Sequence, residues 1–207
     1  MIRSRTSCIL LSAVLLAVTV SSAGAIDLGG HDRDGTVFGL TLGYGWNSIQ
    51  VTPTGKPAVD SGNIGTFSGG ARIGWAPSDY FIGSIGFYGW KKSYYTYNYT
   101  STSASVYHFL LEGAWFPRGE GFWLKGGIGI GTMDFNATAP LAINSIIFNE
   151  SGMTLTAGAG YEFRVSDGAA FGISYDYIYL PVGDFAGFSD VSSTSHNLSL
   201  SMNFYIQ

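Results

Sequence analysis

One histidine, one serine and one carboxylate lie near the C-terminal end of the chain and have the residue types of a hydrolytic triad: His196, Ser199 and Asp176. In such a triad the imidazole takes the serine proton while the carboxylate orients the ring. His196 and Ser199 are three positions apart, and on a β-strand an odd separation places two side chains on opposite faces. The spacing argues against hydrolysis, so we predict a chain that is not an enzyme and carries no cofactor.

A second chemistry-bearing group lies near the N-terminus and consists of Asp27, His31, Asp32 and Asp34. Carboxylates and imidazoles are common metal ligands. The group stands in a short polar stretch outside every predicted element of secondary structure. We interpret it as a solvated tail and predict no metal site.

The remaining ionisable candidates occur singly within segments that alternate polar and apolar residues. By parity, six of them share the polar face: Arg72, His108, Glu112, Lys125, Glu162 and Asp176. Charges held away from water must pair or be hydrated. We therefore predict a network in which Arg72 and Lys125 pair with Glu112, and which Glu162 joins. Such a network either satisfies a packed interior or forms the gate of a narrow ion path.

Eight segments position these residues, and each shows the period-two alternation of a β-strand. The segments are residues 36–47, 64–76, 80–91, 105–116, 122–132, 152–163, 170–180 and 196–207. The links alternate between short turns, at 77–79, 117–120 and 165–168, and longer loops, at 48–63, 92–104, 133–151 and 181–195. All six prolines fall outside the predicted strands. This pattern predicts an all-β, transmembrane, antiparallel up-and-down β-barrel of eight strands.

The composition indicates which face meets lipid. Charged residues make up only 12% of the chain, and 30 residues are glycine. The polar face is mostly Gly, Ser and Thr, which suits a narrow interior better than a solvated surface. The apolar face ends in two aromatic bands, as membrane interfaces favour. We predict a girdle formed by Trp46, Trp75, Tyr107, Trp115, Phe122, Tyr161, Phe163, Tyr177 and Tyr179. These features favour a membrane barrel over a soluble, lipocalin-like one.

The first residues have the pattern of a secretory signal peptide. Arg3 and Arg5 precede an apolar run over residues 9–20, and small residues end at Ala25, where we predict cleavage. An uncleaved anchor is the alternative, although the run is short for a membrane span. The predicted organisation is a signal peptide over 1–25, a short periplasmic segment over 26–35 and the barrel over 36–207.

Cleavage would change the charge of the chain. Lys and Arg together fall from 10 to 8 while Asp and Glu stay at 14, so the formal net charge moves from −4 to −6. An acidic chain without basic clusters argues against binding to nucleic acid. Cys8 leaves with the signal, and no disulfide is then available.

The signal, the eight amphipathic segments and the alternating link lengths together resemble the small outer-membrane barrels of the OmpA-like, OmpX-like and opacity-type superfamily. The resemblance covers the whole mature chain and rests on pattern rather than on a sharp motif. It implies a non-catalytic role in the envelope, with surface-loop interaction or adhesion. It also implies contact with outer-membrane lipid and lipopolysaccharide, and assembly by the barrel-assembly machinery, which commonly reads a terminal aromatic, here Phe204 or Tyr205.

Three functions stay open at this point. Tyr95, Tyr97 and Tyr99 share a parity, so an exposed strand rich in tyrosine could bind an extracellular ligand by edge addition or aromatic contact. This feature favours the surface-interaction role. The glycine-lined interior leaves a narrow pore for ions or small solutes as the alternative, similar to OmpW-type barrels. A lipid-modifying enzyme is a third and weaker alternative.

Overall fold

The computed structural model of the chain describes residues 33–53, 55, 57–60, 62–95, 101–119, 121–138, 146–185 and 188–206. The strands are β1 (Gly35–Pro53), β2 (Val59–Asp60), β3 (Ile64–Ser78), β4 (Phe81–Tyr95), β5 (Ser101–Trp115), β6 (Phe122–Thr138), β7 (Ile146–Ser166), β8 (Ala169–Phe185) and β9 (Phe188–Ile206). The predicted signal peptide lies outside the described residues, as do Asp27, His31 and Asp32. No helix in the described ranges is long and apolar enough to cross a membrane.

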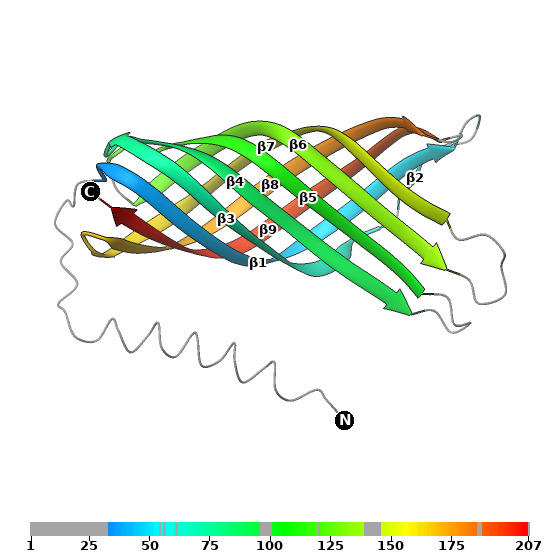
Figure 1. Ribbon diagram of the computed structural model, residues 1–207, viewed down its shortest axis with the longest axis horizontal. Helices are drawn as coiled ribbons and strands as arrows, with labels where there is room; N and C mark the ends of the chain where they lie inside the picture. The colour runs from blue at the N-terminus through cyan, green and yellow to red at the C-terminus, as the bar shows by residue number, and fades with distance from the viewer. Residues whose placement is uncertain are drawn as a thin grey trace, which may run out of the picture.

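The strands close into a barrel because β1 pairs with β3 on one side and with β9 on the other, always antiparallel. The short β2 pairs with β1 alone, at the tip of that strand. Eight strands therefore form the wall within the described part of the chain, which confirms the predicted architecture (Figure 1). The short turns and both ends of the barrel domain, Gly35 and Ile206, lie at one end, the turn side; the opposite end is the loop side.

The offset of the ladders fixes the width of the barrel. A path of paired residues that starts at Tyr161 on β7 and goes once around the wall returns to β7 at Ser151, ten residues earlier. Eight strands with this offset tilt by roughly 40° and enclose a lumen that side chains alone can fill. The inward-facing residues therefore form a core and not the lining of a wide channel.

The strands are longer than predicted on the loop side. β7 has 21 residues and β9 has 19, whereas a transmembrane strand needs about 9–11. Parts of two predicted loops are strand: β4 extends to Tyr95 and β5 begins at Ser101, and β8 extends to Phe185 and β9 begins at Phe188. Beyond the membrane both faces of a strand can be polar. The alternation of polar and apolar residues, from which the strands were predicted, therefore ends before the strands themselves end.

The prediction that all prolines lie outside the strands is wrong for Pro53, Pro77 and Pro181. Pro53 is the last residue of β1. Pro77 and Pro181 stand at register shifts, where the ladder is interrupted and the missing N–H is not needed. Proline therefore marks irregular positions of these strands and not their ends.

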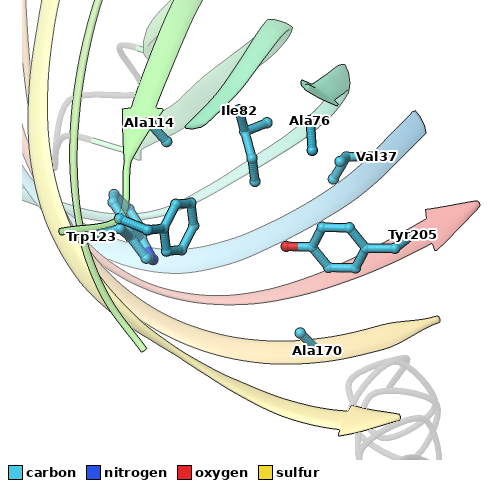
Figure 2. Close-up of a cluster of buried hydrophobic side chains, with 8 residues drawn as sticks. Val37, Ala76, Ile82, Ala114, Trp123, Ala170 and Tyr205 are labelled. Atoms are coloured by element: carbon cyan, nitrogen blue, oxygen red, sulfur yellow. The ribbon is translucent and has the colours of Figure 1, made fainter. Parts of the chain in front are cut away.

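Two apolar clusters fill the ends of the lumen. The turn-side cluster consists of Val37, Ala76, Ile82, Ala114, Phe116, Trp123, Ala170 and Tyr205. Figure 2 shows how its side chains point inward from strands on all sides of the wall. The loop-side cluster consists of Trp90, Ala104, Val106, Met133, Leu180 and Val191. Both clusters are buried, and the middle of the lumen, where Glu112, Lys125 and Asp176 lie, is between them.

Candidate functional site

A lysine at the centre of the lumen holds two carboxylates. The Nζ atom of Lys125 lies 3.0 Å from Glu112 Oε1 and 2.9 Å from Asp176 Oδ1. All three side chains are at least nine-tenths buried. The register pairs Glu112 with Gly127 and Ala114 with Lys125, so the lysine and Glu112 meet on a diagonal between β5 and β6. Asp176 comes from β8, two strands away, and reaches the lysine over Gly158 of β7, which pairs with both residues.

Tyr88 completes this central group, and sequence reasoning did not single it out. Its hydroxyl donates to Glu112 Oε2 at 2.7 Å, and Lys125 Nζ lies 5.0 Å from its ring centroid. Ser174 donates to the second oxygen of Asp176 at 2.9 Å. The alternation in the sequence places Tyr88 on the inward face. A tyrosine is common both in a barrel core and in an aromatic girdle, so the residue type alone did not indicate a role in the charged group.

The predicted pairing of Arg72 with Glu112 is wrong in detail. Arg72 donates through Nη2 to Asn203 Oδ1 at 3.1 Å, and within the described residues no ion pair joins it to Glu112. Asn203 in turn donates to Glu162 Oε2 at 2.8 Å. β3 and β9 flank β1, and Gly39 of β1 pairs with both Arg72 and Asn203, so the arginine meets the amide over a residue without a side chain.

Glu162 belongs to a second ionic group at the turn side, centred on Arg33. Arg33 Nε lies 3.2 Å from Glu162 Oε1, and its guanidinium stacks over Phe116 at 3.9 Å. The hydroxyl of Tyr205 also donates to the Glu162 carboxylate at 2.9 Å. Arg33 is fully buried, although it precedes β1. It was missed because it lies outside every alternating segment, whereas its neighbour Asp34 is exposed as expected of a tail.

His108 lies between the central group and the loop-side cluster. Its Nδ1 is 3.2 Å from Thr154 Oγ1, while its Nε2 is buried without a protein partner. Nearby is a cavity of about 20 Å³, lined in part by His108, Trp90, Asn197 and Lys125. That volume holds about one water molecule. The described interior therefore contains room for an ordered water beside His108.

The candidate triad residues do not come together. Ser199 and Asp176 are buried in the lumen, whereas His196 lies on the outer face and contacts Tyr175. Asp176 is engaged by Lys125 and Ser174 instead. Among the described residues, no three His, Cys, Asp or Glu side chains lie close enough together to hold a metal ion.

The predicted girdle residues all lie on the outer face of the wall. Trp46, Trp75 and Trp115, for example, are each about half exposed, and aliphatic residues between the bands are exposed to a similar extent, up to 68% for Leu200. Trp46 lies toward the loop side, and Trp75 and Trp115 lie toward the turn side. An exposed apolar surface that surrounds the whole molecule matches the lipid-facing band of a membrane barrel.

At the loop side the wall divides into two sheets. The ladder between β3 and β4 ends at Ser68 and Trp90, and the ladder between β7 and β8 ends at Leu155 and Tyr179. Beyond these points β4, β5, β6 and β7 continue as one sheet, here called the β4–β7 sheet. β8, β9, β1 and the start of β3 continue as the other (Figure 1). The loop-side cluster packs between them.

The edge of the β4–β7 sheet consists of residues 91–95 of β4. Thr66 Oγ1 donates to the carbonyl of Lys91 at 3.1 Å, and Lys92 Nζ donates to the carbonyl of Gly65 at 3.0 Å, so side chains replace the ladder at the seam. Since the Lys91 carbonyl points toward β3, the backbone groups of Ser93 point the same way. No described strand pairs with Ser93 on that side. Tyr95 ends this edge; its side chain lies outside the described part, as do Tyr97 and Tyr99.

The comparisons with known proteins identify the family. Residues 11–204 match the model of the outer membrane protein beta-barrel domain, so the chain belongs to that family of bacterial outer-membrane proteins. In this family the short turns face the periplasm and the long loops face the exterior. The loop side, with its two sheets, is therefore extracellular. No curated protein sequence matches the chain.

Solved structures show the same fold at low sequence identity. Ail, the attachment invasion locus protein of Yersinia pestis, is 15% identical with a TM-score of 0.54, over 83% of this chain and 99% of that one. It has also been solved with the heparin analogue sucrose octasulfate. Neisserial surface protein A is 11% identical with a TM-score of 0.50, over 84% and 98% of the two chains. At these identities the likeness concerns the fold.

Proposed function

We propose that this chain is a non-catalytic surface-interaction protein of the outer membrane. In this proposal the barrel anchors the protein in the outer membrane and stabilises its extracellular part. The extracellular edge of the β4–β7 sheet binds an extended polypeptide by adding it as a further strand. The single observation that carries the proposal is that edge: β4 continues past its last partner on β3, and no strand among the described residues pairs with Ser93 on that side.

The packing of the lumen supports an anchoring role over the alternative of a pore. The central charges pair in short contacts, and an apolar cluster lies toward each end of the lumen. An ion would have to break the loop-side cluster, then the Lys125 group and then the turn-side cluster. On the turn side a polar chain runs from Arg72 through Asn203 and Glu162 to Arg33, but its groups are bonded to one another. On the loop side the apolar cluster interrupts the polar surface that a conducting filter needs.

The charges of the extracellular part favour a polypeptide over a sulfated polysaccharide. Among the residues there whose side chains the structure describes, Lys91 and Lys92 stand against four carboxylates: Asp60, Asp134, Glu150 and Asp190. An acidic surface repels a polyanion. We therefore expect sucrose octasulfate, which is bound in one Ail structure, to bind this chain poorly.

The experiment that tests the proposal uses proline to close the edge. Ser93→Pro removes the N–H that points away from β5 and leaves the ladder between β4 and β5 in place, while Ser93→Ala keeps the N–H. The refolded barrel, in lipid nanodiscs, would first select binders from a phage library of random dodecapeptides. Binding of the selected peptides would then be compared among wild type and the two variants.

We expect the selection to yield extended, β-forming peptides. Their affinity should fall at least about tenfold with Ser93→Pro, because backbone hydrogen bonds at the edge are lost, and should stay unchanged with Ser93→Ala. A selection that yields no binder, or binders that tolerate the proline, would contradict edge addition. Heat-dependent migration on a gel confirms that each variant is folded.

A further inference from the structure

One ionisable side chain other than tyrosine faces outward inside the apolar band of the described residues: His196 on β9. Its neighbours along the same face of β9 are Leu198 and Leu200, which are exposed to lipid. A histidine here has no counter-charge from the protein. Ionisable groups inside the lipid-facing band are costly and often mark function, so a charged partner for this ring is sought in the membrane.

The position of His196 is at the outer leaflet. The ladders place it opposite Trp46 of β1 and Tyr177 of β8. The next outward pair toward the exterior, Ser48 and Thr194, is polar. Tyr179 of the girdle stands beside Thr194 at the next position on β8. The row formed by Trp46, His196 and Tyr177 therefore lies near the exterior end of the apolar band, where aromatic residues meet lipid head groups.

The neighbouring aromatic residues hold the imidazole in place. The hydroxyl of Tyr175 lies 2.6 Å from His196 Nδ1, and the ring of Tyr177 packs at 5.1 Å between centroids. With Nδ1 engaged, Nε2 is the ring nitrogen that remains for a ligand. On the other side Trp46 packs edge-on against Tyr44 at 6.1 Å. The result is an oriented donor flanked by exposed aromatic faces.

We propose that this patch, formed by Trp46, Tyr175, Tyr177 and His196, binds the phosphorylated glucosamine head group of lipid A, the membrane anchor of lipopolysaccharide. The imidazole contacts a phosphate oxygen, and the charge-assisted hydrogen bond supplies most of the preference for that lipid. Trp46 and Tyr177 present aromatic faces to the apolar side of the sugar ring. No carboxylate of the described wall flanks the patch on β8, β9 or β1 at this level, so a phosphate meets no repulsion there.

This site is separate from the proposed peptide-binding edge. It lies on β8, β9 and β1 at the membrane surface, whereas the edge belongs to β4 in the extracellular part. A lipid held at the patch would fix the depth of the barrel in the outer leaflet. Failure of either proposal therefore leaves the other unaffected.

The test measures lipid A bound to the barrel in phosphatidylcholine nanodiscs by native mass spectrometry. Diphosphoryl lipid A is the probe, and dephosphorylated lipid A with the same acyl chains is its control. The variants are His196→Ala, which removes the imidazole, and Tyr175→Phe, which removes only the hydroxyl that orients it. Tyr107→Ala is the matched control, because it removes a girdle aromatic from β5, away from the patch.

We expect the wild type to bind diphosphoryl lipid A more tightly than the dephosphorylated lipid. His196→Ala should reduce binding of diphosphoryl lipid A about tenfold, because one hydrogen bond to a charged group is lost. Tyr175→Phe should lose part of that preference, and Tyr107→Ala should keep all of it. Equal binding of the two lipids by the wild type would overturn the proposal. So would equal losses in His196→Ala and Tyr107→Ala, since they would indicate an unspecific aromatic belt.

Discussion

At the scale of single residues, the interior shows how a narrow barrel accommodates charge. Lys125 lies between Glu112 and Asp176, so removing either carboxylate still leaves the lysine a partner. Removing the lysine leaves two buried carboxylates with no cation in contact. Removing the lysine should therefore lower the free energy of unfolding more than removing one carboxylate, because an unpaired buried charge is more destabilising than the loss of one of two ion pairs.

We predict that Lys125→Met lowers the free energy of unfolding by roughly 3–5 kcal/mol. Glu112→Gln should cost only about 1–2 kcal/mol, because the amide can still accept from Tyr88 and Lys125 keeps Asp176. Urea titration of the barrel in lipid vesicles, followed by tryptophan fluorescence, gives both values. If both midpoints equal that of the wild type, the buried ion pairs do not stabilise the barrel; if the order is reversed, Lys125 is not the centre of the group.

At the scale of elements, the strands depend on glycines wherever neighbouring backbones approach closely. A Cβ on Gly129 of β6 would overlap the carbonyl oxygen of Phe109 on β5. Gly126, three residues earlier, faces outward, and a Cβ there would meet nothing closer than 3.9 Å. The same residue type is thus required at one position and dispensable at the other.

Gly129→Ala should destabilise the barrel by about 1–3 kcal/mol, since the strands must separate to admit the methyl group. Gly126→Ala should be neutral or slightly stabilising, because it only restricts the unfolded chain. Unfolding midpoints of the two variants, measured side by side in the same vesicles, check this difference. Equal effects at both positions would mean that the β5–β6 ladder relaxes freely.

At the scale of the whole molecule, sequence reasoning predicted the closed eight-stranded barrel and the direction of its side chains, because period-two alternation encodes both. It could not predict which inward groups meet. That depends on the register of each ladder: Gly39 of β1 pairs with Arg72 on one side and with Asn203 on the other, so these two side chains meet over the glycine and Arg72 does not reach Glu112. Arg33 was out of reach for another reason: it inserts from outside the strands, where no periodicity exists to indicate burial.

The central claim is that the lumen is closed along its length and that the function lies on the outside of the barrel. Single-channel recording of the refolded chain in a planar lipid bilayer tests it most directly, with Glu112→Gln measured beside the wild type. We predict no discrete openings for either protein, because the apolar clusters at both ends stay in place when the central group changes. Discrete openings in the wild type that change with Glu112→Gln would contradict the claim and make the Lys125 group the gate of a pore.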